Sequence, residues 1–177
     1  MTYTLEAFCS DARELLAAKP GPAGRQDCLK ALEKLLKDDD FLAAYCGPGA
    51  EPGIQTVYRD PELDFNVLVH RYAAGKSGPP HDHGESWAIY GQAVGETIMS
   101  TWKRLDDGSE DGKAKLEKDR TYELGPGMAG IFEPKDIHSI VITDNCRFVR
   151  VTGTDLGTIN TLVFNAEDGT VKPGNRL

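Results

Sequence analysis

The feature that most constrains the fold is a series of short strand-like runs, which begins at Ile54 and continues to about residue 165. Turn residues such as Asp106-Asp107-Gly108 separate the runs roughly every 8–12 positions. Many short, evenly spaced strands are typical of a sandwich or a small barrel, so we expect a mainly β protein. Nine strands are predicted, near 54–59, 64–72, 82–91, 94–104, 115–124, 128–133, 138–143, 146–152 and 160–165.

The N-terminal part has a different, helical periodicity. Apolar residues recur at helical spacing in two runs, which are separated by the helix breakers Pro20, Gly21 and Pro22. The runs contain Leu5, Phe8, Ala12, Leu15 and Leu16, and then Leu29, Leu32, Leu35 and Leu36. Two N-terminal α-helices are therefore predicted, each with one apolar stripe that packs on the strands. The predicted organisation is a helical extension at 1–50, a β-domain with a metal site at 51–170 and a loose tail at 171–177.

Charge and cysteine usage narrow the class of protein. The 177 residues carry 20 Lys and Arg against 28 Asp and Glu, a net charge of −8, which argues against nucleic acid or a membrane as a partner. No run approaches the roughly 18 apolar residues of a membrane span, and the first residues lack the pattern of a secretory leader. Four scattered cysteines then indicate reduced thiols and a cytoplasmic protein.

Two of the four histidines, His81 and His83, flank Asp82. On a strand, residues two apart point to the same face, so both imidazoles are expected to converge while Asp82 faces away. His138 begins another predicted strand and can join them if the sheet closes. Neutral imidazole suits Fe, Zn, Ni or Cu, so we predict that His81, His83 and His138 bind one metal ion.

Two further residues near the motif leave alternatives open. His70 lies on a predicted strand with Leu68 and Tyr72, where it could line the site without binding metal. Glu85 points to the same side as His81 and His83, and could then be a metal ligand, only if the strand continues without a break through Gly84. Otherwise it is a solvated acid at the rim.

The segment from Gly75 through His81 to His83 resembles the first half of the cupin signature, which has a glycine, five residues and then His-x-His, and Gly95 stands where the motif closes. The wider stretch Asp64-Phe65-Asn66-Val67-Leu68-Val69 followed by His81-Asp82-His83-Gly84 is similar to thiol dioxygenases of the cysteine dioxygenase type. The late segment Val163-Phe164-Asn165 is also similar to the C-terminal part of these dioxygenases. The resemblance implies a double-stranded β-helix, or jelly roll, with one iron on His81, His83 and His138. Nickel or zinc could replace iron in the purified protein.

The sequence also departs from these families. The general cupin motif often has a glutamate ligand where this chain has Trp87 and Ala88, and thiol dioxygenases lack that carboxylate too. Thiol dioxygenases have a late Ser-x-His-x-Tyr network, and Phe148, Arg150 and Thr152 replace it here. The substitution puts oxidation of cysteine itself in doubt.

Two arginines are candidates for contacting the substrate. Arg150 points into the cavity if the alignment with the family holds, and a buried guanidinium there could grip a carboxylate in a bidentate manner. If the valine face of its strand is the core, Arg150 lies on the surface. Arg59 roughly matches the arginine with which the family holds the carboxylate, and the alternative for it is a surface salt bridge.

The predicted function is that of a metal-dependent cupin oxidoreductase, a non-haem Fe(II) dioxygenase that adds O₂ to a small thiol carboxylic acid and gives a sulfinate. One alternative is another metal-dependent cupin enzyme that cleaves a β-dicarbonyl or isomerises a small acid. A second alternative is a non-catalytic cupin that binds a small molecule. The expected partners are a small-molecule substrate and O₂, and exposed edge strands leave a homodimer possible. Candidate apolar walls of the site are Trp87, Ile89, Met99, Trp102 and Phe132.

Overall fold

The computed structural model describes residues 2–174, which begin with three helices. These are α1 (Leu5–Ala18), α2 (Pro22–Leu35) and α3 (Asp39–Cys46). The first two agree with the predicted helices, and α3 was not predicted. Asp38 caps α3 by accepting a hydrogen bond from the Phe41 amide, and two acids in the first turn complement the helix dipole. The acidic run therefore starts a helix.

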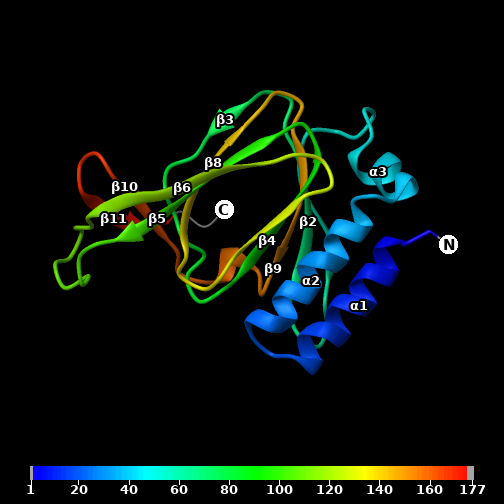
Figure 1. The fold of residues 1–177 in the computed structure, drawn as a ribbon, viewed down its shortest axis with the longest axis horizontal. Helices are drawn as coiled ribbons and strands as arrows, with labels where there is room; N and C mark the ends of the chain where they lie inside the picture. Colours follow the sequence, from blue (N-terminus) through cyan, green and yellow to red (C-terminus); the bar gives the residue numbers. More distant parts are fainter. Residues whose placement is uncertain (1, 175–177) are drawn as a thin grey trace.

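The rest of the chain is mainly β and forms antiparallel sheets. The five-stranded sheet has the order β1-β2-β9-β4-β7, and the four-stranded sheet has the order β3-β8-β5-β6. The pair β10-β11 forms at the end remote from the helices (Figure 1). The strands are β1 (Gly53–Arg59), β2 (Asn66–Arg71), β3 (Lys76–Ser77), β4 (Ala88–Val94), β5 (Thr97–Arg104), β6 (Leu116–Leu124), β7 (Ala129–Phe132), β8 (Ile137–Ile142), β9 (Arg147–Thr152), β10 (Leu162–Asn165) and β11 (Thr170–Pro173).

Two predictions of local structure were wrong. The strand predicted at 82–91 begins only at Ala88, because residues 82–87 form a turn. The predicted loose tail at 171–177 starts inside β11, which pairs with β10 from Leu162↔Pro173 to Asn165↔Thr170. Residues 175–177 of that tail lie outside the described residues.

A buried cluster between the two sheets draws side chains from both of them. Its members are Ala88, Tyr90, Met99, Leu124, Phe132, Ile142, Cys146 and Phe148. Because β4, β7 and β9 belong to one sheet and β5, β6 and β8 to the other, the two sheets pack face to face around this interior.

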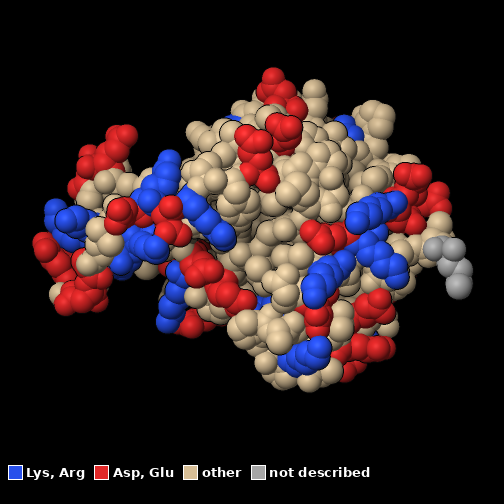
Figure 2. Space-filling model, in the orientation of Figure 1, with Lys and Arg blue, Asp and Glu red and all other residues tan. Residues whose placement is uncertain are grey.

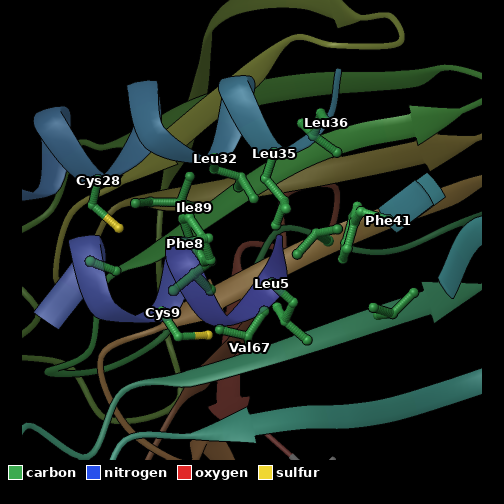
Figure 3. Close-up of a cluster of buried hydrophobic side chains, with 14 of the residues drawn as sticks. Leu5, Phe8, Cys9, Cys28, Leu32, Leu35, Leu36, Phe41, Val67 and Ile89 are labelled. Carbon is green, nitrogen blue, oxygen red and sulfur yellow. The ribbon is translucent and has the colours of Figure 1, made fainter. Parts of the chain in front are cut away.

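A second core lies between the helices and the outer face of the five-stranded sheet. Figure 3 shows side chains of α1 and α2, among them Phe8 and Leu32, directed toward Val67 and Ile89 of the sheet. Val149 and Val151 of β9 belong to the same cluster. The valines of β9 thus pack under the helices, while the alternate residues of the strand point between the sheets.

The contact between α2 and β4 depends on the missing side chain of Gly91. A Cβ atom there would lie 2.7 Å from methyl groups of both Leu32 and Leu36. We expect Gly91→Val to lower the free energy of unfolding by about 1–3 kcal/mol, because the helix must shift to relieve the overlap. Urea unfolding tests this expectation. Gly78→Val is the control, since nothing lies within 4 Å of a Cβ at that position. Equal stability of the two variants would contradict it.

The surface is electrostatically mixed. Figure 2 shows Lys and Arg interspersed with Asp and Glu over the helices and over the opposite end of the molecule, with a largely uncharged region between. Within residues 2–174, no helix is both long enough and apolar enough to cross a bilayer.

Candidate metal centre and arginine-lined cavity

The backbone brings His81 and His138 directly opposite each other. The His81 amide donates to the His138 carbonyl at 2.9 Å, and the His138 amide donates to the His81 carbonyl at 3.0 Å. Such a pair places both side chains on the same face. His83 completes the group, and one potential ligand atom from each histidine lies within 4.8 Å of those of the other two. The three predicted residues therefore form a cluster that could hold a metal ion.

Asp82 fixes the turn that carries His81 and His83. Its carboxylate faces away from the cluster, as predicted, and accepts hydrogen bonds from the amides of Gly84 at 3.0 Å and Leu162 at 2.8 Å. Gly84 has φ of 56°, and a Cβ there would lie 2.1 Å from the carbonyl oxygen of Asn160. The hydrogen bonds of Asp82 thus fix a turn in which the side chains of His81 and His83 converge. The continuous strand that was predicted here is not needed to bring them together.

The ring nitrogens of the cluster are suited to a metal ion. The Nδ1 atom of His81 donates to the Pro79 carbonyl at 3.0 Å, which leaves its Nε2 lone pair free. Nδ1 of His83 and both ring nitrogens of His138 are buried and have no hydrogen-bond partner in the described part of the chain. Burial lowers the pKa of His83 and His138 well below the usual value, so both rings are neutral. Neutral, unpartnered imidazole nitrogens fit a transition-metal ion.

Arg150 lies on the interior face of β9 and is buried, with 9% of its surface exposed. Its Nε atom has no hydrogen-bond partner, and no carboxylate among residues 2–174 forms an ion pair with it. After burial itself, the positive charge of Arg150 is among the causes that lower the pKa of His81 and His83. The alternative that Arg150 lies on the surface is therefore wrong. The valine face of β9 is buried under the helices, and Arg150, on the opposite face, points between the sheets.

Arg150 and Arg59 both line a cavity of about 240 Å³, and His81, His83 and His138 are not among its lining residues. The remaining lining mixes polar residues such as Asn66 and Thr152 with apolar ones such as Leu68. The Arg59 guanidinium pairs with Asp155 at 2.8 Å, its Nε donates to Asn66, and more than half of its side chain is exposed. Arg59 already has an anionic partner, whereas Arg150 has none within residues 2–174.

The two residues left open near the motif lie outside the cluster. His70 is buried and stacks on Phe148 with ring centroids 4.5 Å apart, and its Nδ1 lies 3.2 Å from the Tyr72 hydroxyl. Glu85 is largely exposed and pairs with Lys135 at 2.7 Å, which matches the solvated rim acid.

The predicted apolar walls divide among three clusters, and Trp102 packs against the smallest of them, formed by Ala114, Ile137 and Phe164. Met99 and Phe132 belong to the core between the sheets, and the ring of Phe132 stacks on His138 at 3.8 Å. Ile89 and Trp87 instead pack in the cluster beneath the helices. Ile89 and Trp87 therefore cannot line the site.

Sequence reasoning missed Tyr90, which lies between the sheets with its hydroxyl 3.2 Å from Nε2 of His83. The signal was present, because Tyr90 has the same strand parity as Ala88, the position at which a carboxylate ligand was sought.

The four cysteines are buried and free. Burial raises the pKa of the Cys9 and Cys28 thiols to about 12 and that of Cys46 to about 11. Thiols with such pKa values are poor nucleophiles at neutral pH, in agreement with their interpretation as ordinary core residues.

Burial of four imidazoles predicts that acid destabilises the metal-free protein. Burial lowers the pKa of His70, His81, His83 and His138 in the folded state, while unfolded histidine titrates near pH 6.5. Below about pH 6.5 the unfolded chain binds more protons, so the free energy of unfolding falls as the pH falls. Urea unfolding at pH 7.5, 6.5 and 5.5 should show this decrease. His70→Phe should reduce the slope by about one proton, and a urea midpoint that is constant with pH would contradict the expectation.

The fold and site define a mainly β protein with a candidate three-histidine metal centre. No protein-family model matches the chain, and no curated protein matches it. Similar solved structures include a cupin superfamily protein from Desulfitobacterium hafniense, at 14% identity and a TM-score of 0.44, over 63% of this chain and 87% of that one.

Two other solved structures are also similar to this chain. KdgF from a Halomonas species is 22% identical with a TM-score of 0.42, over 58% of this chain and 79% of that one. An oxalate oxidase in complex with the substrate analogue glycolate is 16% identical with a TM-score of 0.40, over 70% of this chain and 56% of that one. Identities this low carry no information about the chemistry of the site.

Proposed function

We propose that the chain is a cupin with a double-stranded β-helix and that it is a metal-dependent oxidoreductase, a non-haem Fe(II) dioxygenase that acts on a small thiol carboxylic acid. The observation that carries the proposal is the cluster of His81, His83 and His138, in which His83 and His138 are buried and each histidine offers one potential ligand atom within 4.8 Å of the others. Supporting features are the two facing antiparallel sheets and the glycine, five residues and His-x-His that lead into the cluster.

His81, His83 and His138 would hold the metal ion. Three neutral imidazoles leave its positive charge uncompensated, which favours an anionic ligand such as a thiolate. When bound, Fe(II) supplies the redox chemistry by which O₂ is added to sulfur and brings the two reactants together. The stacked Phe132 and the neighbouring Met99 contribute apolar surface that excludes water from this side of the cluster.

Arg150 and the cavity indicate the class of substrate. A cavity of about 240 Å³ is smaller than the roughly 300–1,000 Å³ that drug-sized ligands occupy, so it suits a small molecule. The buried Arg150 guanidinium requires an anionic partner, and a substrate carboxylate can supply it through two parallel hydrogen bonds. Arg59 lines the same cavity and would help to bind the substrate carboxylate if its guanidinium left Asp155 and paired with the substrate.

Metal analysis followed by O₂ uptake tests the proposal. The purified protein is loaded anaerobically with Fe(II), and O₂ consumption is then measured with cysteine, 3-mercaptopropionate, cysteamine and acetylacetone. We expect uptake with a thiol acid and a sulfinate product, with little uptake for cysteamine, which lacks the carboxylate. The matched control is Fe(II)-loaded protein without organic substrate.

The other outcomes separate the alternative functions. The residues Phe148, Arg150 and Thr152 provide no Ser-x-His-x-Tyr network, and this feature favours cleavage of a β-dicarbonyl as the second candidate. Uptake with acetylacetone alone would select that reaction. A full equivalent of bound metal without turnover of any compound would instead indicate a binding protein.

A further inference from the structure

Tyr90 places a phenol oxygen at the three-histidine cluster. Its side chain is buried, with 3% exposed, and its hydroxyl lies 3.2 Å from Nε2 of His83. Its ring centroid lies 5.6 Å from that of His138 and 6.1 Å from that of His83. Two atoms that each lie about 2.1 Å from one ion are separated by about 3.0–3.4 Å, so with Nε2 as the ligand atom of His83 the observed spacing is that of neighbouring ligand atoms.

The surroundings of Tyr90 leave this position open to it. Ala88, two residues earlier on β4, points into the same interior and is fully buried. Its methyl group offers no ligand atom, and the next side chain on that face is Tyr90. Tyrosine is long enough for its hydroxyl to reach back from Tyr90 to the level of His83. The strand that lacks a carboxylate near the cluster thus carries another oxygen donor.

The local charges also favour an oxygen donor at this point. Arg150 lies directly opposite Tyr90 in the β4–β9 register, so the guanidinium and the phenol share the interior face. A metal ion held by three neutral imidazoles and the nearby Arg150 would both be positive. The oxygen lone pairs of the Tyr90 hydroxyl can face either of these positive groups.

We propose that the Tyr90 hydroxyl oxygen is the fourth protein ligand of the metal held by His81, His83 and His138. The proposal rests on the proposed metal centre and goes beyond it. It assigns the centre three nitrogen ligands and one oxygen ligand from the protein, with the remaining positions left for substrate and O₂.

The experiment uses the colour of iron(III) phenolate complexes. The full-length protein is loaded anaerobically with Fe(II), oxidised to Fe(III) and examined by visible absorption and resonance Raman spectroscopy. We expect a charge-transfer band in the visible region with tyrosine ring vibrations in resonance. Tyr90→Phe should abolish the band and raise the dissociation constant for the metal at least about 10-fold.

Tyr72→Phe is the matched control, because Tyr72 also has its hydroxyl 3.2 Å from a histidine nitrogen, but that histidine is His70, outside the cluster. The control should keep the band and the affinity. A full equivalent of Fe(III) without the band, or a band that persists in Tyr90→Phe, overturns the role of Tyr90 and leaves the three-histidine centre intact. Failure of the wild-type protein to retain any iron overturns the centre itself and the Tyr90 proposal with it.

Discussion

Replacing His138 by alanine should abolish metal binding and, with it, any O₂ uptake. The side chain is fully buried, both of its ring nitrogens lack a partner, and it lies closest to the other two rings, with centroids 4.4 Å from His81 and 4.8 Å from His83. Loss of one of three imidazoles should raise the dissociation constant for the metal about 100-fold or more. Elemental analysis of dialysed protein and titration with a competing chelator measure this change.

Two further variants keep the His138 result interpretable. His138→Ala removes the ring that stacks on Phe132, which lowers the stability of the fold. His81→Gln alters a half-buried residue, keeps that stacking and should also strip the metal. His70→Gln is the control, because this buried histidine lies outside the cluster and should leave metal content unchanged. A full equivalent of metal in His138→Ala or His81→Gln would remove that residue from the ligand set.

Arg150→Leu should separate stability from substrate binding. Arg150 is a buried cation without an ion pair in the described part of the chain, so an apolar side chain of similar size should raise the free energy of unfolding of the metal-free protein by about 1–4 kcal/mol. The same change removes the proposed partner of the substrate carboxylate and should weaken substrate binding about 30-fold or more. Chemical unfolding and the KM for the thiol acid measure the two effects.

Arg59→Leu provides the comparison for Arg150. Since Arg59 is more than half exposed and already pairs with Asp155, its replacement should change stability little and weaken substrate binding less than Arg150→Leu does. Metal content should stay at one equivalent in both variants. If Arg150→Leu lowered stability and left the KM unchanged, the guanidinium would have a structural role in place of the proposed one.

The alternation of β9 shows how much of the fold the sequence could predict. Its residues were correctly divided into a valine face and a face with Phe148, Arg150 and Thr152, because strand parity is a local property. Whether the valine face or the Arg150 face packs against the helices depends on where α1 and α2 lie, which is a property of the tertiary structure. The same limit explains why Ile89 was predicted in the site and lies under the helices.

The three-histidine cluster could be predicted because histidine is rare in this chain and His81 and His83 lie two positions apart. The turn at 82–87 could not, since it depends on Asp82 bonding to Leu162, which lies 80 positions away. The pairing of Arg59 with Asp155 spans 96 positions and was equally out of reach. Tyr90 was overlooked because only carboxylates were considered as a fourth ligand.

The two-sided character of β9 has a consequence for protein engineering. Positions that hold the helical layer and positions that face the interior alternate along one strand, so the two sets can be varied independently. A library confined to Arg150 and Thr152, together with Leu68 of β2, would change the lining of the cavity while the valine contacts under the helices stay untouched. The architecture thus separates the residues that maintain the scaffold from those open to adaptation.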